Sequence, residues 1–237
     1  GTRRGDGVLL EKVGFEECLN AAKNSDHWQS DIGQPEEGKV RGRGLATGYW
    51  MNGGGPSTCD LMLMDDGIVM MNEGSADIGG TRASIAMQAA EVLGLSAEDI
   101  KPTIPDTDSI GYSSGAGGSG VTFKTGTACV EAAYDIRDQM CQRAAKIWDV
   151  DVADVGYEGS DISHKSDPAL NMSFQELSSM LNSTGGPIVG RATVNPSGVG
   201  NAFAVHLVDV RVDRKAGKVD VLRDTSIQDV GKAIHAS

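Results

Sequence analysis

The sequence lacks features that would place it in a membrane or on nucleic acid. Its 237 residues contain no apolar run approaching the roughly 20 residues of a membrane span, and no signal-like apolar stretch at the amino terminus. Acidic residues outnumber basic ones, 33 to 21, and give a net charge of -12. A negatively charged protein is repelled by nucleic acid and by anionic membranes. Since no basic stripe offsets this charge, we expect a soluble, cytoplasmic protein.

The chain also lacks the spacing of cysteines and histidines that holds a metal ion or an iron-sulfur cluster. It contains no Cys-x-x-Cys pair, and a chain of this length needs no disulfide framework. Free cysteines are commonly buried. We therefore expect reduced core thiols and no metal held by protein side chains. The residues concerned are Cys18, Cys59, Cys129, Cys141, His27, His164, His206 and His235.

Hydrophobic periodicity, with 39% hydrophobic residues, predicts an α+β fold of layered antiparallel or mixed sheets with packed helices. The turn signal Asp65-Asp66-Gly67 predicts a hairpin, and we expect residues 39–51, 58–64 and 68–72 to form a β-meander. Helical spacing is found in 14–28, 81–93, 121–148 and 173–181. Strands are predicted at 39–51, 58–64, 68–72, 100–104, 155–163, 187–194, 202–213 and 218–228.

Two glycine-rich loops precede predicted helices, at 74–82 and 113–122. Glycines let backbone N–H groups approach an anion, and a helix start favours negative charge. Arg82 would add a charged donor to the first loop. Neither loop has the Gly-x-Gly-x-x-Gly or Walker pattern, so a plain strand-to-helix connection is the alternative. Together the two loops suit a long ligand that carries phosphate.

Gly111-Tyr112-Ser113-Ser114-Gly115 matches the Gly-x-Ser-x-Gly elbow of serine hydrolases. His164 and His206 follow in a permissible chain order. The motif lacks the preceding apolar strand that the elbow requires, so a hydrolase using Ser113 is only the alternative function.

Other candidate groups have simpler explanations. We expect Asp77, Asp106 and Asp108 to act as turn formers, because aspartate bonds its local backbone. Methionines of the predicted hairpin are expected to be adaptable core packing rather than a soft-metal site. They are Met62, Met64, Met70 and Met71.

Several segments, in order and spacing, resemble the xanthine dehydrogenase and aldehyde oxidase family over essentially the entire chain. They include Gly38–Ala46, Asp77-Ile78-Gly79, Ala90–Leu95, Asp106-Thr107-Asp108, Gly118-Ser119, Thr125–Ala128, Val208–Asp213 and Gln228–Ile234.

This resemblance implies that residues 1–237 are part of one molybdopterin-binding region, which could divide into 1–150 and 151–237. It implies a molybdopterin cofactor, with the cytosine dinucleotide as one form, and partner domains or subunits that carry iron-sulfur clusters and FAD. The complete enzyme would hydroxylate an aldehyde or N-heterocycle oxidatively. The implied cofactor-binding residues are Gly79, Gly80, Thr81 and Arg82 on the pterin side, and Gly118, Ser119 and Thr122 toward the pyrophosphate or nucleotide.

The chain departs from the family pattern in ways that imply an incomplete enzyme. Gly80 stands where the family loop has glutamine, and Thr81 stands at its second glycine. The family's general-base glutamate, in a Gly-x-Gly-Glu segment, would lie after Asp229-Val230-Gly231, and no such segment occurs here. With no initial methionine either, we expect a fragment of a longer subunit, with no catalytic residue of its own and no turnover in isolation. A split subunit or a scaffold without cofactor stays open.

Overall fold

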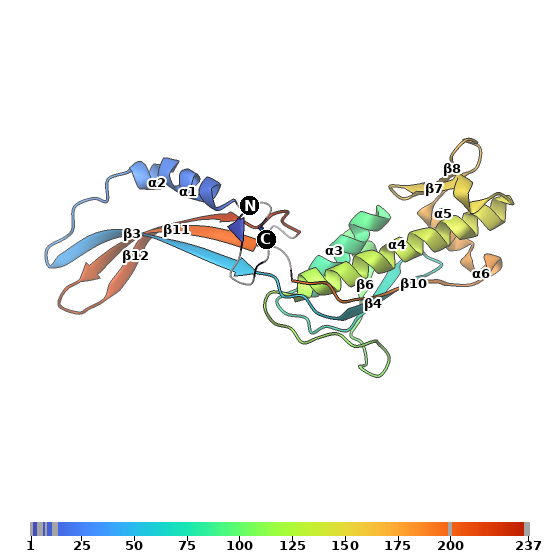
Figure 1. Cartoon of the computed structure of the whole chain (residues 1–237), viewed down its shortest axis with the longest axis horizontal. Coiled ribbons are helices and arrows are strands. Elements are labelled where there is room, and N and C mark those ends of the chain that lie inside the picture. The colour runs from blue at the N-terminus through green and yellow to red at the C-terminus, as the bar shows by residue number, and fades with distance from the viewer. Residues whose placement is uncertain (1, 4–6, 8, 11–13, 199–200, 235–237) are drawn as a thin grey trace. The chain divides into compact units, whose positions relative to one another are not determined.

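The computed structural model describes residues 2–3, 7, 9–10, 14–198 and 201–234, and Figure 1 labels its elements. Contacts divide the chain into two compact units. The first comprises Gly1–Met51 and Gly200–Ala233, and the second comprises Asn52–Val199 and Ile234–Ser237. Residue 150, at which the sequence suggested a division, lies within the second unit.

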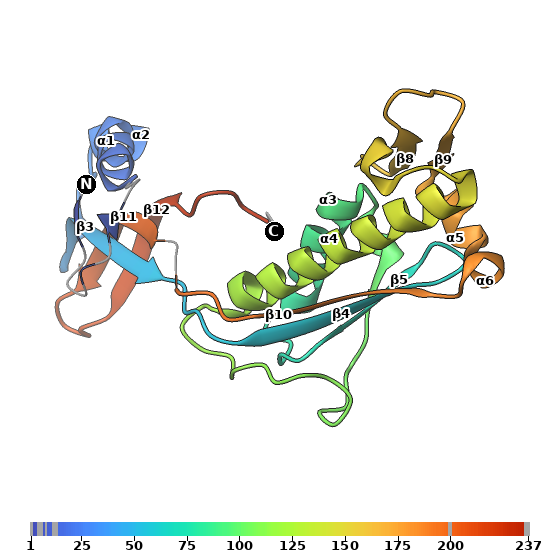
Figure 2. The same ribbon diagram turned by 45° about the vertical axis from the view of Figure 1, so that its right-hand side comes forward.

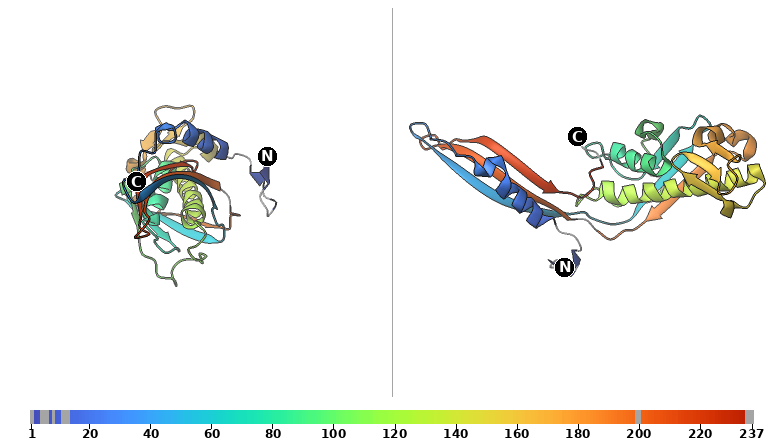
Figure 3. Two further views of the ribbon diagram at one scale, coloured as in Figure 1. Left: turned by 90° about the vertical axis from the view of Figure 1, so that its left-hand side faces the viewer. Right: turned by 90° about the horizontal axis from the view of Figure 1, so that it is seen from above.

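The first unit contains a three-stranded antiparallel sheet in the order β12-β11-β3, with helices along one face (Figure 3). The central strand β11 pairs with β3 from Asn201, opposite Met51, to Asp213, opposite Lys39. A separate pair is formed by β1 and β2. The elements of this unit are β1 (Thr2–Arg3), β2 (Leu9–Leu10), α1 (Phe15–Asn24), α2 (Asp26–Gln29), β3 (Lys39–Met51), β11 (Asn201–Asp213) and β12 (Val219–Asp229).

The region 14–28 is helical as predicted, but it forms two helices rather than one, with a break at Ser25. Ser25 has extended backbone (φ -67°, ψ 149°), and its hydroxyl accepts a hydrogen bond from the Trp28 amide at 3.1 Å. That bond satisfies one of the amides left unpaired at a helix start. Cys18 and Ala22 of α1 are buried with Val205 of β11, as the helical spacing predicted.

The predicted β-meander is wrong in its first strand. Strands β4 and β5 do form the expected hairpin, but β3 pairs with β11, more than 150 positions later in the chain. Alternation along a strand indicates which side chains share a face, and it contains no information about the partner. Strand β11 has the same length as β3 and forms a ladder with it from end to end, which decides the pairing.

In the second unit, a four-stranded sheet in the order β10-β4-β5-β6 has α3 and α4 on one face (Figure 2). Strands β7, β8 and β9 form a second, antiparallel sheet. The bounds are β4 (Ser57–Leu63), β5 (Val69–Glu73), α3 (Thr81–Leu93), η1 (Ala97–Asp99), β6 (Ile100–Pro102), α4 (Val121–Trp148), η2 (Val152–Asp154), β7 (Val155–Glu158), β8 (Asp161–His164), β9 (Asn171–Ser173), α5 (Phe174–Ser179), α6 (Leu181–Thr184) and β10 (Ile188–Val194). Segregated helices and mostly antiparallel strands confirm the predicted α+β class.

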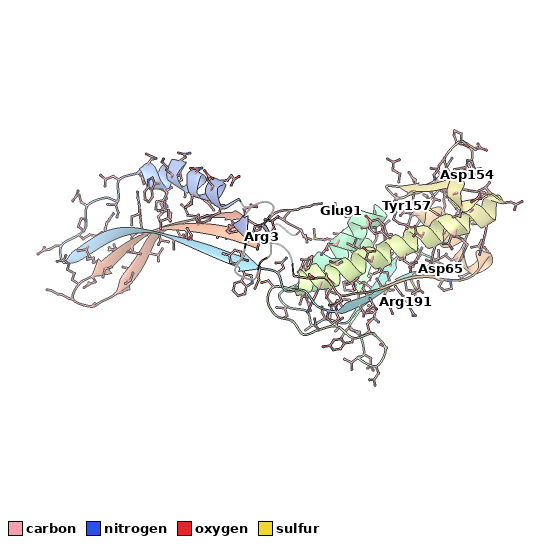
Figure 4. The ribbon with its side chains drawn as sticks, in the orientation of Figure 1. Arg3, Asp65, Glu91, Asp154, Tyr157 and Arg191 are labelled. Carbon is pink, nitrogen blue, oxygen red and sulfur yellow. The ribbon has the colours of Figure 1, made fainter. Side chains whose placement is uncertain are left out.

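The core of this unit lies between the sheet and α4. Leu61 of β4 and Met140 of α4 are both fully buried in it. A Cβ atom on Gly190 of β10 would lie 2.1 Å from the Ala132 carbonyl oxygen, so only glycine lets α4 approach the strand this closely. At the far end of α3, the hydroxyl of Tyr157 (labelled in Figure 4) donates to the Leu93 carbonyl at 2.7 Å. Close backbone approach thus places α4 against β10, and a side-chain hydrogen bond ties the end of α3 to β7.

The cysteine and methionine predictions are confirmed only in part. The four cysteines are free thiols, and Cys141 alone among them is half-buried rather than buried. Of the four methionines, Met71 is fully buried, whereas Met62 and Met64 are 39% and 37% exposed. Successive strand residues point to opposite faces of a sheet, so one methionine in the hairpin can be core while its neighbours face solvent.

Residues 155–163 are two strands rather than the one predicted, because Gly159 takes a positive φ of 61° and turns the chain between β7 and β8. A capping box starts the next helix, α5: the Ser173 hydroxyl accepts from the Glu176 amide, and the Glu176 carboxylate accepts from the Ser173 amide. Within the described ranges, no helix combines the length and the apolar character needed to cross a membrane.

Candidate functional site

Helices α3 and α4 begin at the walls of one cavity of about 330 Å³. The first N–H groups of a helix have no acceptor within the helix, and the helix dipole makes that end positive. Two such ends at one cavity favour an anion. The cavity is lined by Ile78, Thr81, Ala116, Gly117, Ser119, Gly120, Val121 and Thr122, and none of these residues is acidic. The structure therefore brings the two predicted loops together.

Backbone conformation opens space beside the first loop. Gly79 and Gly80 have positive φ angles of 62° and 83°, and an added Cβ on either would meet no atom within 4 Å. In the second loop, Gly118 and Ser119 have φ angles of 58° and 56°. Ser119 is unusual because residues other than glycine, asparagine and aspartate rarely adopt this left-handed backbone region. Both loops turn sharply into their helices and are exposed at the turn.

The first loop is held by Asp77. Its carboxylate accepts hydrogen bonds from the Thr81 hydroxyl at 3.3 Å and from the Arg82 amide at 3.2 Å. The Thr81 hydroxyl in turn accepts from the Ile78 amide at 3.1 Å. This confirms Asp77 as a turn former, and Asp106 acts in the same way by accepting from the Asp108 amide at 2.9 Å. Among the described residues, the Asp108 carboxylate has no hydrogen-bond partner.

Arg82 forms an ion pair with the protein itself. Its Nε donates at 3.1 Å to the carboxylate of Glu73, which is fully buried, and its Nη2 donates at 3.2 Å to the Ser75 carbonyl. The second oxygen of Glu73 accepts from the Ser75 amide at 2.6 Å. Nη1 has no hydrogen-bond partner among the described residues. Arg82 thus holds the first loop in place through Glu73 and Ser75.

A third run of glycines, not identified in the sequence analysis, supports the second loop. The Gly53 amide donates to the Gly118 carbonyl at 2.6 Å. A Cβ on Gly120 would lie 2.6 Å from the Gly53 oxygen and 3.2 Å from the Gly117 oxygen. The signal in the sequence was the triplet Gly53-Gly54-Gly55. Consecutive glycines permit close approach of two backbones.

We therefore expect Gly120→Ala to lower the free energy of unfolding by about 1–3 kcal/mol, because the added methyl group would clash with fixed backbone oxygens. Gly115→Ala is the matched control, since a Cβ there meets no atom within 4 Å. Its effect should stay within about 0.5 kcal/mol. Urea titration followed by circular dichroism measures both. Equal stability of the two variants would show that the two loops are not tightly packed.

The environment of Ser113 does not support a hydrolase. Its hydroxyl accepts from the Thr58 amide at 3.1 Å and lies 3.3 Å from the Ser57 hydroxyl, so its neighbours are not histidines. His164 instead accepts from the amide of Asp167, and His206 lies 3.5 Å from the carboxylate of Asp224. A serine nucleophile needs a base within hydrogen-bonding reach. Ser113 is better explained as a contact that ties the second loop to β4.

Lys124, like the glycine run at 53–55, was not identified from the sequence. It is 2% exposed, and its Nζ donates to the Ser114 and Gly115 carbonyls at 3.0 and 2.9 Å and to the Ser114 hydroxyl. Helical spacing predicts that position 124 is buried. The sequence alone does not show that the loop at Ser114 and Gly115 lies beside this lysine, so it suggested no function for it.

Comparison with known proteins identifies the family and the fold of the chain. Residues 19–237 match the model of a molybdopterin cofactor-binding domain family. The chain is 25% identical to the probable hypoxanthine oxidase XdhD of Escherichia coli strain K12, over 93% of this chain and 23% of that protein. The chain therefore spans about a quarter of the length of the curated relatives it matches.

Two solved structures have the same fold. The aldehyde oxidoreductase from Desulfovibrio desulfuricans ATCC 27774 superposes with a TM-score of 0.73 at 20% identity, covering 100% of this chain and 25% of that one. Quinoline 2-oxidoreductase from Pseudomonas putida 86 gives 0.71 at 22% identity, covering 93% and 30%. With a family match over nearly the entire length, the predicted resemblance is confirmed, and the chain belongs to the molybdopterin cofactor-binding domain family.

Proposed function

We propose that the cavity at the starts of α3 and α4 holds part of a molybdopterin cofactor. The observation that carries the proposal is that two helix amino termini line one cavity and that no lining residue is acidic, in a chain with a net charge of -12. The Asp77 carboxylate at the start of α3 is already bonded to the Thr81 hydroxyl and the Arg82 amide. Its volume of about 330 Å³ suits part of a cofactor, such as a pyrophosphate group, rather than a complete dinucleotide. The open space beside Gly79 and Gly80 leaves room for the rest.

In this proposal the two loops have different tasks. Gly79, Gly80, Thr81 and Arg82 face the pterin side, where Thr81 fixes the loop and Arg82 offers Nη1. The second loop binds the pyrophosphate or nucleotide end through the backbone of Gly118, Ser119 and the helix start, and through Thr122. Backbone N–H groups bind phosphate oxygens well because they are fixed before the ligand arrives.

For the complete protein we propose oxidative hydroxylation of an aldehyde or N-heterocycle. The molybdenum-pterin group supplies the oxygen-transfer chemistry, and this chain binds and orients it. Electrons would pass to iron-sulfur clusters and a flavin on other domains or subunits. No general base is assigned among the 237 residues, because the expected glutamate motif is absent from them.

Cofactor content tests the proposal. Molybdenum by elemental analysis and pterin by fluorescence after oxidation should both approach one per chain in the full-length natural protein. Replacing Thr122 by valine removes a hydroxyl at the cavity and should lower pterin content several-fold, because a hydrogen bond to a charged group is worth about 1.5–3 kcal/mol.

Thr127→Val is the matched control on the same helix. The Thr127 hydroxyl bonds the Phe123 carbonyl within α4, and the residue is not part of the cavity lining. Its pterin content should equal that of the wild type. Absence of both metal and pterin from the wild type would favour a scaffold without cofactor.

A further inference from the structure

Lys124 places a buried amine directly behind the second loop. Its backbone amide bonds the Gly120 carbonyl, within the first turns of α4, and its side chain reaches back to Ser114 and Gly115. Those two residues immediately precede the stretch 116–122, most of which lines the cavity. The side chain therefore spans the loop from the helix to the point where the lining begins.

The amine has neutral partners only. Its three donors are matched by three oxygens, two carbonyls and one hydroxyl, and no ion pair involves Lys124 in the described part of the chain. Burial lowers the pKa of the amine. A buried cation is costly unless a negative charge lies near it. Among the residues that the structure describes, the protein supplies three neutral hydrogen-bond acceptors to this amine and no carboxylate, so a counter-charge would have to come from a ligand.

We propose that Lys124 is a positioning residue of the cofactor cavity, whose ammonium group fixes Ser114 and Gly115 and whose charge is balanced by the phosphate of the ligand. This inference rests on the proposed function. It adds that the affinity of the cavity for a phosphate-bearing ligand depends on a residue outside its lining.

The test uses inorganic pyrophosphate as the probe. Full-length protein is purified from cells that cannot make molybdopterin, and binding is measured by titration calorimetry. Lys124→Gln removes the charge but can still donate a hydrogen bond, so we expect it to bind pyrophosphate at least about tenfold more weakly. Lys146→Gln is the control: it removes the same charge from an exposed site about 33 Å along the same helix. Its affinity should change by less than about twofold.

A thermal melt of each variant separates binding from folding, because a purely structural role would lower the melting temperature and leave the affinity of the folded protein unchanged. Lys124→Met repeats the test with an unbranched apolar side chain. Equal affinity of wild type and folded Lys124 variants would overturn the role of Lys124 and leave the proposed function intact. Failure of the wild type itself to bind pyrophosphate would count against the proposed function. Unfolding of both variants would make Lys124 a structural residue and overturn the inference.

Discussion

Replacing Arg82 by methionine is expected to lower the free energy of unfolding by about 3–5 kcal/mol, because it leaves the buried carboxylate of Glu73 without its ion-pair partner. Glu73 is fully buried, and the side chain of Arg82 is 18% exposed. Methionine approximates the aliphatic stem of arginine, so the loss reports the charge rather than a cavity. Urea unfolding of the two proteins measures the difference.

The double variant Glu73→Gln with Arg82→Met tests the cause. It removes both charges, while glutamine can still accept from the Ser75 amide as Glu73 does. Replacing both partners of a buried pair is often nearly neutral, so most of the stability should return. If the double variant is as unstable as Arg82→Met alone, the buried carboxylate is not the source of the loss.

The same double variant separates two roles of Arg82 in cofactor binding. Once stability has returned, a normal pterin content would mean that Arg82 serves only to brace the first loop. A low pterin content in a stable protein would support direct binding through Nη1. The sequence alone predicted the second role, and the structure adds the first.

Asp209→Asn is expected to lower the stability of the first unit by a similar amount, about 3–5 kcal/mol. The Asp209 carboxylate accepts from Arg43 at 2.7 and 2.8 Å and lies 3.2 Å from Nε2 of the fully buried His27. Asparagine keeps the shape and removes the charge that these groups face. Asp220→Asn on the same sheet is the control, since its pair with Arg211 is more exposed and should be worth less than about 1 kcal/mol. Similar losses in both variants would contradict a special role for Asp209.

Stability should also depend on Asp209 at acid pH. The hydrogen bonds from Arg43 lower the pKa of this carboxyl from 3.8 to about 2. A carboxyl whose pKa is lower in the folded protein stabilises it fully above the unfolded pKa, and this contribution is lost as pH falls through the folded pKa. Wild-type protein should therefore lose up to about 2 kcal/mol between roughly pH 4 and pH 2. The Asp209→Asn protein should lack this component in an acid titration followed by circular dichroism.

Local patterns in the sequence determined most of the elements. The 3.6-residue spacing gave α4 and α3 with their observed bounds, Val121–Trp148 and Thr81–Leu93, because one face of each helix packs on the sheet. Alternation gave β3 with equal accuracy, at Lys39–Met51. Family resemblance then predicted the molybdopterin-binding class, which the family match confirmed.

Only the tertiary structure decided which segments meet. It paired β3 with β11, and it placed Thr81 and Thr122, 41 positions apart, on one cavity. It also paired Arg82 with the buried carboxylate of Glu73, and it placed the Lys124 amine against the loop at Ser114 and Gly115. Periodicity reports the environment of a residue relative to its own helix or strand, so it is set locally. Strand pairing, burial of a charge and convergence of two helix starts depend on the packing of the entire unit, and a local pattern does not contain them.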